Sequence, residues 1–252
     1  MQLIEMTAPE VRSLARDTPV VIPVAALEQH GGHLPVFTDS MLLGEIARRV
    51  SERFAGEALF APLLWLGNSH HHLDFSGTLS ASPRVYLDVL RDLAENFIQH
   101  GFRRIVFING HGGNDVPGRQ ATFELRQQYR ERSDLLLVFA TYWLLGSKPR
   151  EHDVSLVQEE MGHACEWETS MILKLRPDLV KEWRELAPVE FGNAFLPAHR
   201  AWVMQDRSEP GHIGHPARAS AEKGERLLDV FSNDVAALLR RVASWDGKSW
   251  NG

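Results

Sequence analysis

The sequence predicts a single α/β domain in which helices cover both faces of a mostly parallel central sheet. Short apolar segments typical of buried strands alternate along the chain with longer segments of helical period. That alternation is typical of a parallel sheet between layers of helices. A length of 252 residues suits one such domain, and the chain has no internal repeat or low-complexity linker that would divide it. We therefore expect residues 1–252 to form one domain.

The expected elements follow the hydrophobic pattern in chain order. Apolar runs predict strands at residues 20–27, 59–66, 103–108 and 135–141. Helical periodicity predicts helices at residues 41–54, 83–100, 114–132, 166–175 and 219–243. One irregular stretch, residues 187–216, is rich in Pro, Gly, His and aromatic residues. It is too long for an ordinary connection, so we expect a functional lid or a subunit contact there.

Composition narrows the classes of function. One cysteine excludes an intrachain disulfide framework and is consistent with a reducing compartment. The first residues lack a basic region followed by a sustained apolar stretch, and no apolar run is long enough to span a bilayer. We therefore expect a cytoplasmic protein without a membrane partner. A net charge of −6 with charges of mixed sign gives no electrostatic footprint for nucleic acid.

Residues of the kinds that bind metals follow the first predicted strand. Glu28, His30, His33 and Asp39 lie within twelve residues, directly after the apolar run. Residues two apart at the end of a strand point to the same side. Glu28 and His30 are therefore expected to reach one metal ion or two neighbouring ions.

A second group of candidate residues follows the strand at residues 103–108. His111 stands there between Asn109-Gly110 and Gly112-Gly113. In open parallel sheets ligands gather outside the carboxyl ends of the strands, so this loop can converge with the loop after the first strand. Gly112 and Gly113 would let the backbone approach a bound ligand and would expose N–H groups at the start of a helix.

These pieces carry a resemblance to the creatininase (creatinine amidohydrolase) family. They occur in family order from about residue 19 to about residue 228, so the resemblance covers most of the chain. The matching pieces are Glu28–Gly31 with His33–Pro35 and Thr38–Asp39, Phe75–Ser80, His100–Phe102 with Asn109–Asn114, His163–Ser170, and Gly214–Pro216 with Ala221–Gly224.

The resemblance implies a binuclear metal centre in a hydrolase of C–N bonds. It places Glu28 and His111 on one metal ion, His30 on the other, and Asp39 between both. Two cations held by a shared carboxylate can polarise a carbonyl and activate a bridging hydroxide that attacks it. Nitrogen and oxygen ligands without thiolate suit two divalent ions, Zn first, with Mn or Fe(II) as alternatives.

The chain departs from creatininase proper at two places. Where creatininase has a bulky residue and then a metal-binding Glu after the His, this chain has Gly112 and Gly113. Glu168 is our candidate for the missing ligand, although a carboxylate early in a helix also favours the helix dipole without any metal. Gly162 replaces an acidic residue before His163. Both changes point away from creatinine and toward the wider family, which includes deformylases and a peptide-trimming enzyme.

His163 is the candidate for proton transfer to the leaving nitrogen, because an imidazole titrates near neutral pH. The alternative is a hydrogen-bonded His that caps its helix. Cys165 is expected to be a small buried side chain and not a nucleophile.

We expect the substrate pocket to involve three short segments. One of His70 to His72, with His71 as our choice, is expected to face the site from a loop that continues through Ser76, Gly77 and Thr78; the alternative is a surface loop. Trp143 follows the last strand and is a candidate pocket wall, or else a core residue. Gly112 and Gly113 complete the set. The remaining histidines are interpreted one by one as solvated or hydrogen-bonded residues: His33, His100, His152, His199, His212 and His215.

The leading hypothesis is a binuclear metal-dependent amidohydrolase that acts on a small cyclic amide, a formamide or a related compound. One alternative is a metallopeptidase-like enzyme that trims a short peptide, and another is a metal-binding family member without turnover. A deep pocket closed by residues 187–216 would favour a small substrate, and an open groove would favour a peptide. The resemblance also implies a homo-oligomer, often a hexamer.

Overall fold

Four parallel strands form the central sheet of the computed structural model, which describes residues 1–146 and 148–250. The strands are β1 (Val20–Val24), β2 (Leu59–Phe60), β3 (Arg104–Asn109) and β4 (Leu136–Thr141), in the order β2-β1-β3-β4. Val24 lies opposite Asn109, and Asn109 lies opposite Thr141. The carboxyl ends of β1, β3 and β4 therefore meet at one edge, and the predicted α/β class with a parallel sheet is confirmed.

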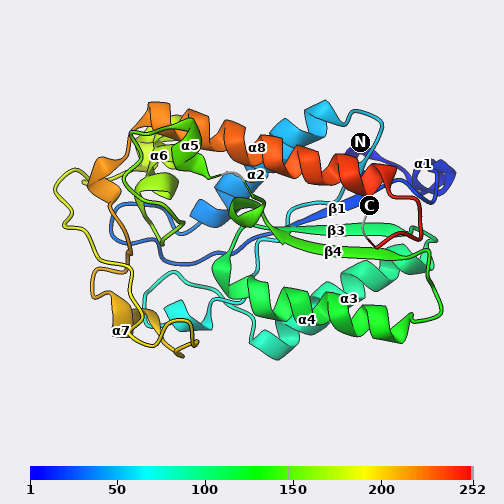
Figure 1. The fold of residues 1–252 in the computed structure, drawn as a ribbon, viewed down its shortest axis with the longest axis horizontal. Coiled ribbons are helices and arrows are strands. Elements are labelled where there is room, and N and C mark those ends of the chain that lie inside the picture. The colour runs from blue at the N-terminus through cyan, green and yellow to red at the C-terminus, as the bar shows by residue number, and fades with distance from the viewer. Residues whose placement is uncertain (147, 251–252) are drawn as a thin grey trace.

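Helices cover both faces of this sheet (Figure 1). On one face lie α2 (Thr38–Arg53), α6 (Glu166–Leu175) and α8 (Ala221–Ser244), and on the other lie α3 (Pro83–Gln99) and α4 (Asp115–Gln128). The core is split accordingly, because successive strand side chains point to opposite faces. Val21 of β1 packs in the cluster with α2, α6 and α8, whereas Ile22 packs in the cluster with α3 and α4.

The remaining helical elements are short. Three are α-helices: α1 (Ala8–Ser13), α5 (Pro149–His152) and α7 (Met204–Arg207). Single 3₁₀ turns lie at Leu3–Glu5, His70–His72, Gly112–Asn114, Tyr142–Leu144, Pro177–Leu179 and Pro216–Arg218. None of the helices in the described part of the chain combines the length and apolar character needed to cross a membrane.

The strand expected at residues 59–66 is much shorter in the structure. β2 ends at Phe60 because Pro62 has no N–H to donate to a sheet ladder. Pairing with β1 resumes at Leu64, whose N–H donates to the Pro23 carbonyl at 2.9 Å. On its outer side Phe60 donates its N–H to the carbonyl of Met1 at 2.9 Å, so the first residues cover the edge of β2.

Other boundaries shift in ways that matter for the site. The strand predicted at residues 20–27 ends at Val24, and the chain then leaves the sheet to form the loop that carries Glu28 and His30. Helix α2 begins at Thr38 rather than at residue 41, which places Asp39 in its first turn. Helix α6 has the predicted bounds, Glu166–Leu175.

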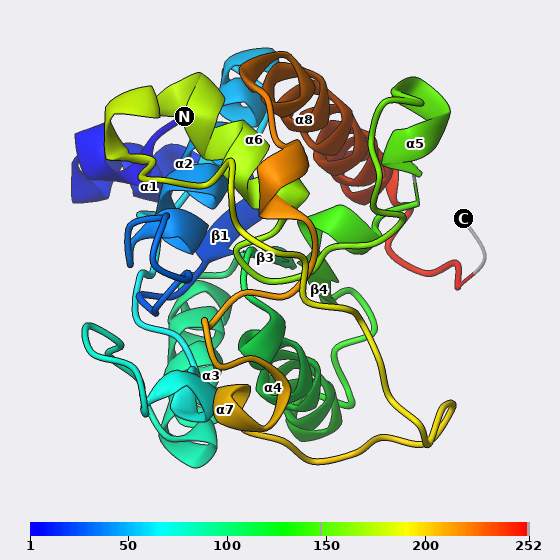
Figure 2. The ribbon, with the colours of Figure 1, turned by 90° about the vertical axis from the view of Figure 1, so that its left-hand side faces the viewer.

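The irregular segment at residues 187–216 lies across the end of the molecule where the strands terminate (Figure 2). Its two ends are held by short antiparallel bridges, Val189 with Gly214 and His163 with Ile213. Between them the chain runs through a long loop and α7. The segment therefore stands directly over the carboxyl ends of the sheet.

Candidate metal centre

The five residues predicted to bind metals meet at the carboxyl edge of the sheet. Glu28 and His30 come from the loop after β1, and His111 follows β3. Asp39 and Glu168 stand in the first turns of α2 and α6. All five are buried. Segments far apart in the sequence thus bring two imidazoles and three carboxylates into one place.

Asp39 lies between the two imidazoles. Its Oδ1 is 3.1 Å from His30 Nε2, and its Oδ2 is 3.0 Å from His111 Nδ1. Glu28 Oε1 lies 3.3 Å from the same nitrogen of His111, and Glu168 Oε1 lies 3.6 Å from His30 Nε2. The side chains therefore form two adjoining groups that share Asp39.

Each imidazole has its second nitrogen turned toward the backbone. His30 Nδ1 is 3.1 Å from the Glu28 carbonyl oxygen, and His111 Nε2 is 3.0 Å from that of Asn68. A carbonyl oxygen can only accept, so these nitrogens carry the protons. In the neutral form of each ring, the lone pairs of His30 Nε2 and His111 Nδ1 face the carboxylates, as in metal sites, where the other ring N–H is held by a carbonyl or a carboxylate.

Two carboxylate oxygens of this group lack a hydrogen bond although they are buried. They are Glu28 Oε2 and Asp39 Oδ2. Buried carboxylates without partners are costly unless a cation compensates them. One ligand atom each from Glu28, His30 and Asp39 lies within 4.8 Å of the others. The residues therefore fit divalent metal binding with oxygen and nitrogen ligands.

The electrostatics of the group point the same way. Burial raises the pKa of Glu28. Burial disfavours charge on His111, but Glu28 and Asp39 outweigh it and raise the pKa of His111 to about 10. Burial also disfavours charge on His30, but Asp39 and Glu168 outweigh this effect and raise the pKa of His30 well above its ordinary value. Without a metal ion, these carboxylates therefore draw positive charge onto the neighbouring imidazoles.

His163 lies beside the two groups. Its Nε2 donates to the backbone carbonyl of Gln29 at 2.8 Å, and its Nδ1 is 3.5 Å from Glu28 Oε1. Its ring centroid is 4.3 Å from that of His30. Burial, together with His30 and His72, keeps the pKa of His163 well below its ordinary value. A neutral His163 with a bare Nδ1 is suited to accept a proton from a molecule in the cavity.

The histidine tract contributes two residues to the cavity rather than one. His71 and His72 both line it, whereas His70 is exposed and bonds Ser80. Burial lowers the pKa of His71 to about 3 and that of His72 to about 2. Both rings are therefore neutral at ordinary pH.

Gln29 fixes the tautomer of His72. The Oε1 of Gln29 accepts from Gly31 N at 2.8 Å, and its Nε2 donates to the Gly211 carbonyl at 2.9 Å, which sets the amide orientation. The second proton on Nε2 points to His72 Nδ1 at 2.8 Å. His72 Nδ1 is therefore an acceptor, and its protonated Nε2 faces Glu28 Oε1 at 3.5 Å. In this tautomer His72 faces Glu28 with an N–H and not with a lone pair, so we do not count it among the metal ligands.

An asparagine network holds the loop that carries His111. Asn109 binds the backbone of His111 on both sides, accepting from its N–H at 3.1 Å and donating to its carbonyl at 2.7 Å. Asn114 donates to the Ala25 carbonyl at 2.9 Å and accepts from Asn68 N at 2.9 Å. The loop after β3 is thereby tied to the loops after β1 and β2.

A cavity of about 620 Å³ opens onto these residues. Of the expected substrate residues, His71, Gly112, Gly113 and Trp143 line it. Ser76, Gly77 and Thr78 do not line it; Ser76 and Gly77 are exposed, and Thr78 is buried and accepts a hydrogen bond from Gln29 N at 3.1 Å. His33 is also buried away from the cavity, against Thr169.

Further lining residues were not proposed as site residues from the sequence. They include Asn68, His72, Pro83, Val116, Pro117, Met161, Phe191, His199, Ala201, Trp202, Met204, Arg207 and Ile213. Most of them come from residues 187–216, a segment whose composition marked it as unusual but gave no indication of which side chains turn inward.

A family model described as creatinine amidohydrolase matches residues 4–239 of this chain. The chain belongs to the creatininase family. It is 32% identical over 238 residues to the mycofactocin precursor peptide peptidase of Mycobacterium tuberculosis, covering 90% of this chain and 85% of that protein. It is 31% identical over 246 residues to the creatinine amidohydrolase of Pseudomonas putida, covering 92% of each.

Solved creatininases share the fold. The crystal structure of a creatinine amidohydrolase superposes with a TM-score of 0.81 and 27% identity over 95% of this chain and 96% of that one. A mutant creatininase of Zn-Zn type and a creatininase structure named for Mn each match with a TM-score of 0.79 and 28% identity, over 95% of this chain and 97% of theirs. The chain is thus a creatininase-family amidohydrolase, and the expectation of a hydrolase is confirmed.

The structure explains both departures from creatininase proper. A Cβ at Gly113 would lie 2.1 Å from the Asn68 carbonyl and 2.5 Å from His111 Nε2, so no carboxylate side chain fits there. A Cβ at Gly162 would lie 2.2 Å from the Ile213 carbonyl. Glu168 instead turns Oε1 toward His30, while its Oε2 accepts from Cys165 N at 3.4 Å. It both caps its helix and faces the centre.

Proposed function

We propose that this creatininase-family protein uses two divalent cations to hydrolyse the C–N bond of a small cyclic amide, a formamide or a related compound. The observation that carries the proposal is the position of Asp39, whose two oxygens face His30 and His111 separately at 3.1 and 3.0 Å. Glu28 and His111 would hold one cation, His30 and Glu168 the other, and Asp39 both. Zinc is the first candidate, with manganese or iron(II) as alternatives.

Divalent cations held by these residues would supply polarisation of a substrate carbonyl and a water molecule of lowered pKa. The protein's own residues orient the ligands and move the proton. His163, neutral and with a bare Nδ1, would accept the proton released by the attacking water and return it to the leaving nitrogen. The Nε2–H of His163 is held in a hydrogen bond to the backbone carbonyl of Gln29. Nδ1 is therefore the atom that would exchange protons with the substrate.

The volume of the cavity, and the segment that lies over it, support the proposal of a small substrate. About 620 Å³ is within the range of roughly 300–1,000 Å³ that is typical of small-molecule sites. Phe191, Trp202 and Ile213 line it from the irregular segment. We propose that residues 187–216 act as a lid.

A second candidate function is the trimming of a short peptide. It is favoured by the 32% identity to a peptidase over 90% of the chain. A non-catalytic role is less well supported, because all five proposed ligands and His163 stand together. We also propose a cytoplasmic homo-oligomer, because the resemblance implies a homo-oligomer that is often a hexamer. Exposed Phe123 on α4 is a candidate contact residue, and light scattering on the purified protein would test the oligomeric state.

The experiment that tests the proposed function joins metal analysis to a substrate screen. Protein purified without chelator should contain two equivalents of divalent metal and hydrolyse a compound from a panel of cyclic amides, formamides and short peptides. Asp39→Ala should lose both ions, or keep at most one, because the shared carboxylate no longer screens the repulsion between them. Asp74→Ala, at an exposed position, is the control. Two full equivalents of metal in Asp39→Ala would contradict the shared ligand.

A further inference from the structure

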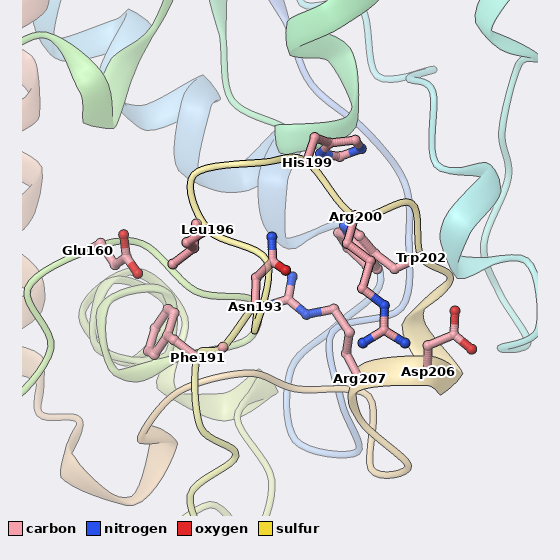
Figure 3. Close-up of a pocket in the computed structure, with 10 residues that line it drawn as sticks. Glu160, Phe191, Asn193, Leu196, His199, Arg200, Trp202, Asp206 and Arg207 are labelled. Carbon is pink, nitrogen blue, oxygen red and sulfur yellow. The ribbon is translucent and has the colours of Figure 1, made fainter.

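A second cavity of about 320 Å³ shares part of its lining with the metal centre cavity. Figure 3 shows the residues that line this second cavity. Residues of the proposed lid form most of it, and Glu160 lies at its far end. Four residues line both cavities: Phe191, His199, Trp202 and Arg207. A molecule held at the metal centre could therefore extend past Arg207.

Arg207 is a partly buried cation without an anionic partner. Its guanidinium makes no hydrogen bond or ion pair within the described residues, and its side chain reaches into the cavity toward Asn193. Other partly buried arginines are partnered: Arg49 binds Glu45 and Glu225, and Arg104 binds the Trp245 carbonyl. Burial lowers the pKa of Arg207, and only Glu160 opposes this. A partly buried cation of this kind favours an anion beside it.

Aromatic contacts connect Arg207 to the metal centre. Its Cζ lies 4.7 Å from the ring centroid of Trp202, a cation–π contact that holds the guanidinium against the wall. Trp202 meets His71 edge-on at 4.9 Å, and His71 stacks against His111 at 5.8 Å. The position of the guanidinium relative to the proposed ligands is therefore set by packed rings.

We propose that Arg207 binds a carboxylate of the substrate while the scissile C–N bond lies at the metal centre. The proposal rests on the proposed function and names its substrate class: amides or formamides that carry a free carboxylate. A guanidinium binds a planar carboxylate through two parallel hydrogen bonds. A singly charged group also suits the site better than a phosphate dianion, because Glu160 and Asp206 line the same cavity.

Matched pairs of compounds test the proposal. N-formylglycine, N-formyl-β-alanine and N-formyl-4-aminobutyrate are each compared with the corresponding terminal amide, which removes the charge and keeps the formyl end. The wild-type protein, as purified with its metals, should prefer the carboxylate by about 10- to 100-fold in at least one pair, the size of one charged hydrogen-bonded contact. Arg207→Met should reduce that preference to within about 3-fold, and Arg207→Lys should keep an intermediate preference.

For each pair that is hydrolysed, the preference is the ratio of the two values of kcat/KM. For each pair that is not hydrolysed, it is the ratio of the two dissociation constants measured by calorimetry. Absence of turnover would count against the proposed function, while the calorimetric preference would still decide the role of Arg207. Arg130→Met, at an exposed arginine in the turn after α4, is the control and should keep the wild-type preference. Three outcomes would each overturn the proposal. The wild type could show the same constants for carboxylates and amides, it could bind none of the carboxylates, or Arg207→Met could keep the wild-type preference.

Discussion

At the scale of single residues, backbone carbonyls decide which nitrogen of His30, His111 and His163 is available, and the Gln29 side chain does the same for His72. The residue types and the spacing of Glu28 and His30 after a strand were enough to predict a metal site. The tautomers were not predictable, because they depend on contacts distant in sequence: Gln29 is oriented by Gly211, which lies 182 residues away. The same limit explains why the inward turn of His72 was missed.

His163→Ala should retain its metals and lose most turnover. Its proposed task is proton transfer, and general acid–base catalysis contributes roughly 10²–10⁴-fold, so kcat should fall by about that factor. The loss should shrink for substrates with better leaving groups. Steady-state kinetics with parallel metal analysis would measure both effects.

The matched control for this variant is His70→Ala, since His70 belongs to the same histidine-rich part of the site but is exposed. Loss of metal in His163→Ala would make His163 a ligand instead, which its distance of 3.5 Å from Glu28 also permits. Near-wild-type turnover on a substrate with a poor leaving group would remove it from the mechanism.

Glu168→Gln should weaken one metal site by at least about 10-fold and spare the other, because an amide oxygen is a poorer ligand than a carboxylate. Titration of metal-depleted protein with Zn²⁺ would resolve the two sites. Glu222→Gln is the control, because Glu222 also stands in the first turn of a helix but is exposed. Equal loss in both variants would reduce Glu168 to a helix-capping residue.

At the scale of elements, the long periodic segments were predictable and the short ones were not. Helix α6 and strand β4 match their expected positions closely. Strand β4 is an unbroken run of strand-forming residues, and α6 is buried along most of its length. Helix α7 has four residues, too few to show a period, and its stability comes from the structure around it. The prediction of one strand over residues 59–66 did not take into account Pro62, which ends the strand early.

Within the loop between β3 and α4, two adjacent glycines should respond oppositely to the same change. Gly113→Ala should destabilise the fold by about 1–3 kcal/mol and displace His111, because its Cβ has no space beside the Asn68 carbonyl. Gly112→Ala should be tolerated, since no atom lies within 4 Å of its Cβ position. Thermal unfolding and metal content measure the two outcomes. Wild-type stability of Gly113→Ala would show that the loop can rearrange.

At the scale of the whole molecule, the proposed metal centre joins elements that the sheet alone does not hold together. It links the loops after β1 and β3 with the first turns of α2 and α6. Cations that bind only the folded state stabilise it by about 4 kcal/mol at a thousandfold excess over Kd. For a chain of this size that corresponds to a rise in Tm of roughly 10 °C.

Removal of the metals with a chelator should therefore lower Tm by roughly 10 °C, and added Zn²⁺ or Mn²⁺ should restore it. Calorimetric scans before and after dialysis would measure the change. Asp39→Ala should respond little to chelator, because its sites are already weak. An unchanged Tm in fully depleted wild-type protein would mean that the centre contributes nothing to holding these elements together.

The covered edge of β2 has a consequence for how copies of this protein can meet. An uncovered edge strand is a template on which a neighbouring chain can add its own strand, and this is a common route to aggregation. Here Met1 occupies the outer side of Phe60, and the missing N–H of Pro62 prevents a longer ladder. The sheet is therefore closed to growth on this side. Copies that approach it have to associate through helices and loops, where side chains rather than backbone groups determine the partner.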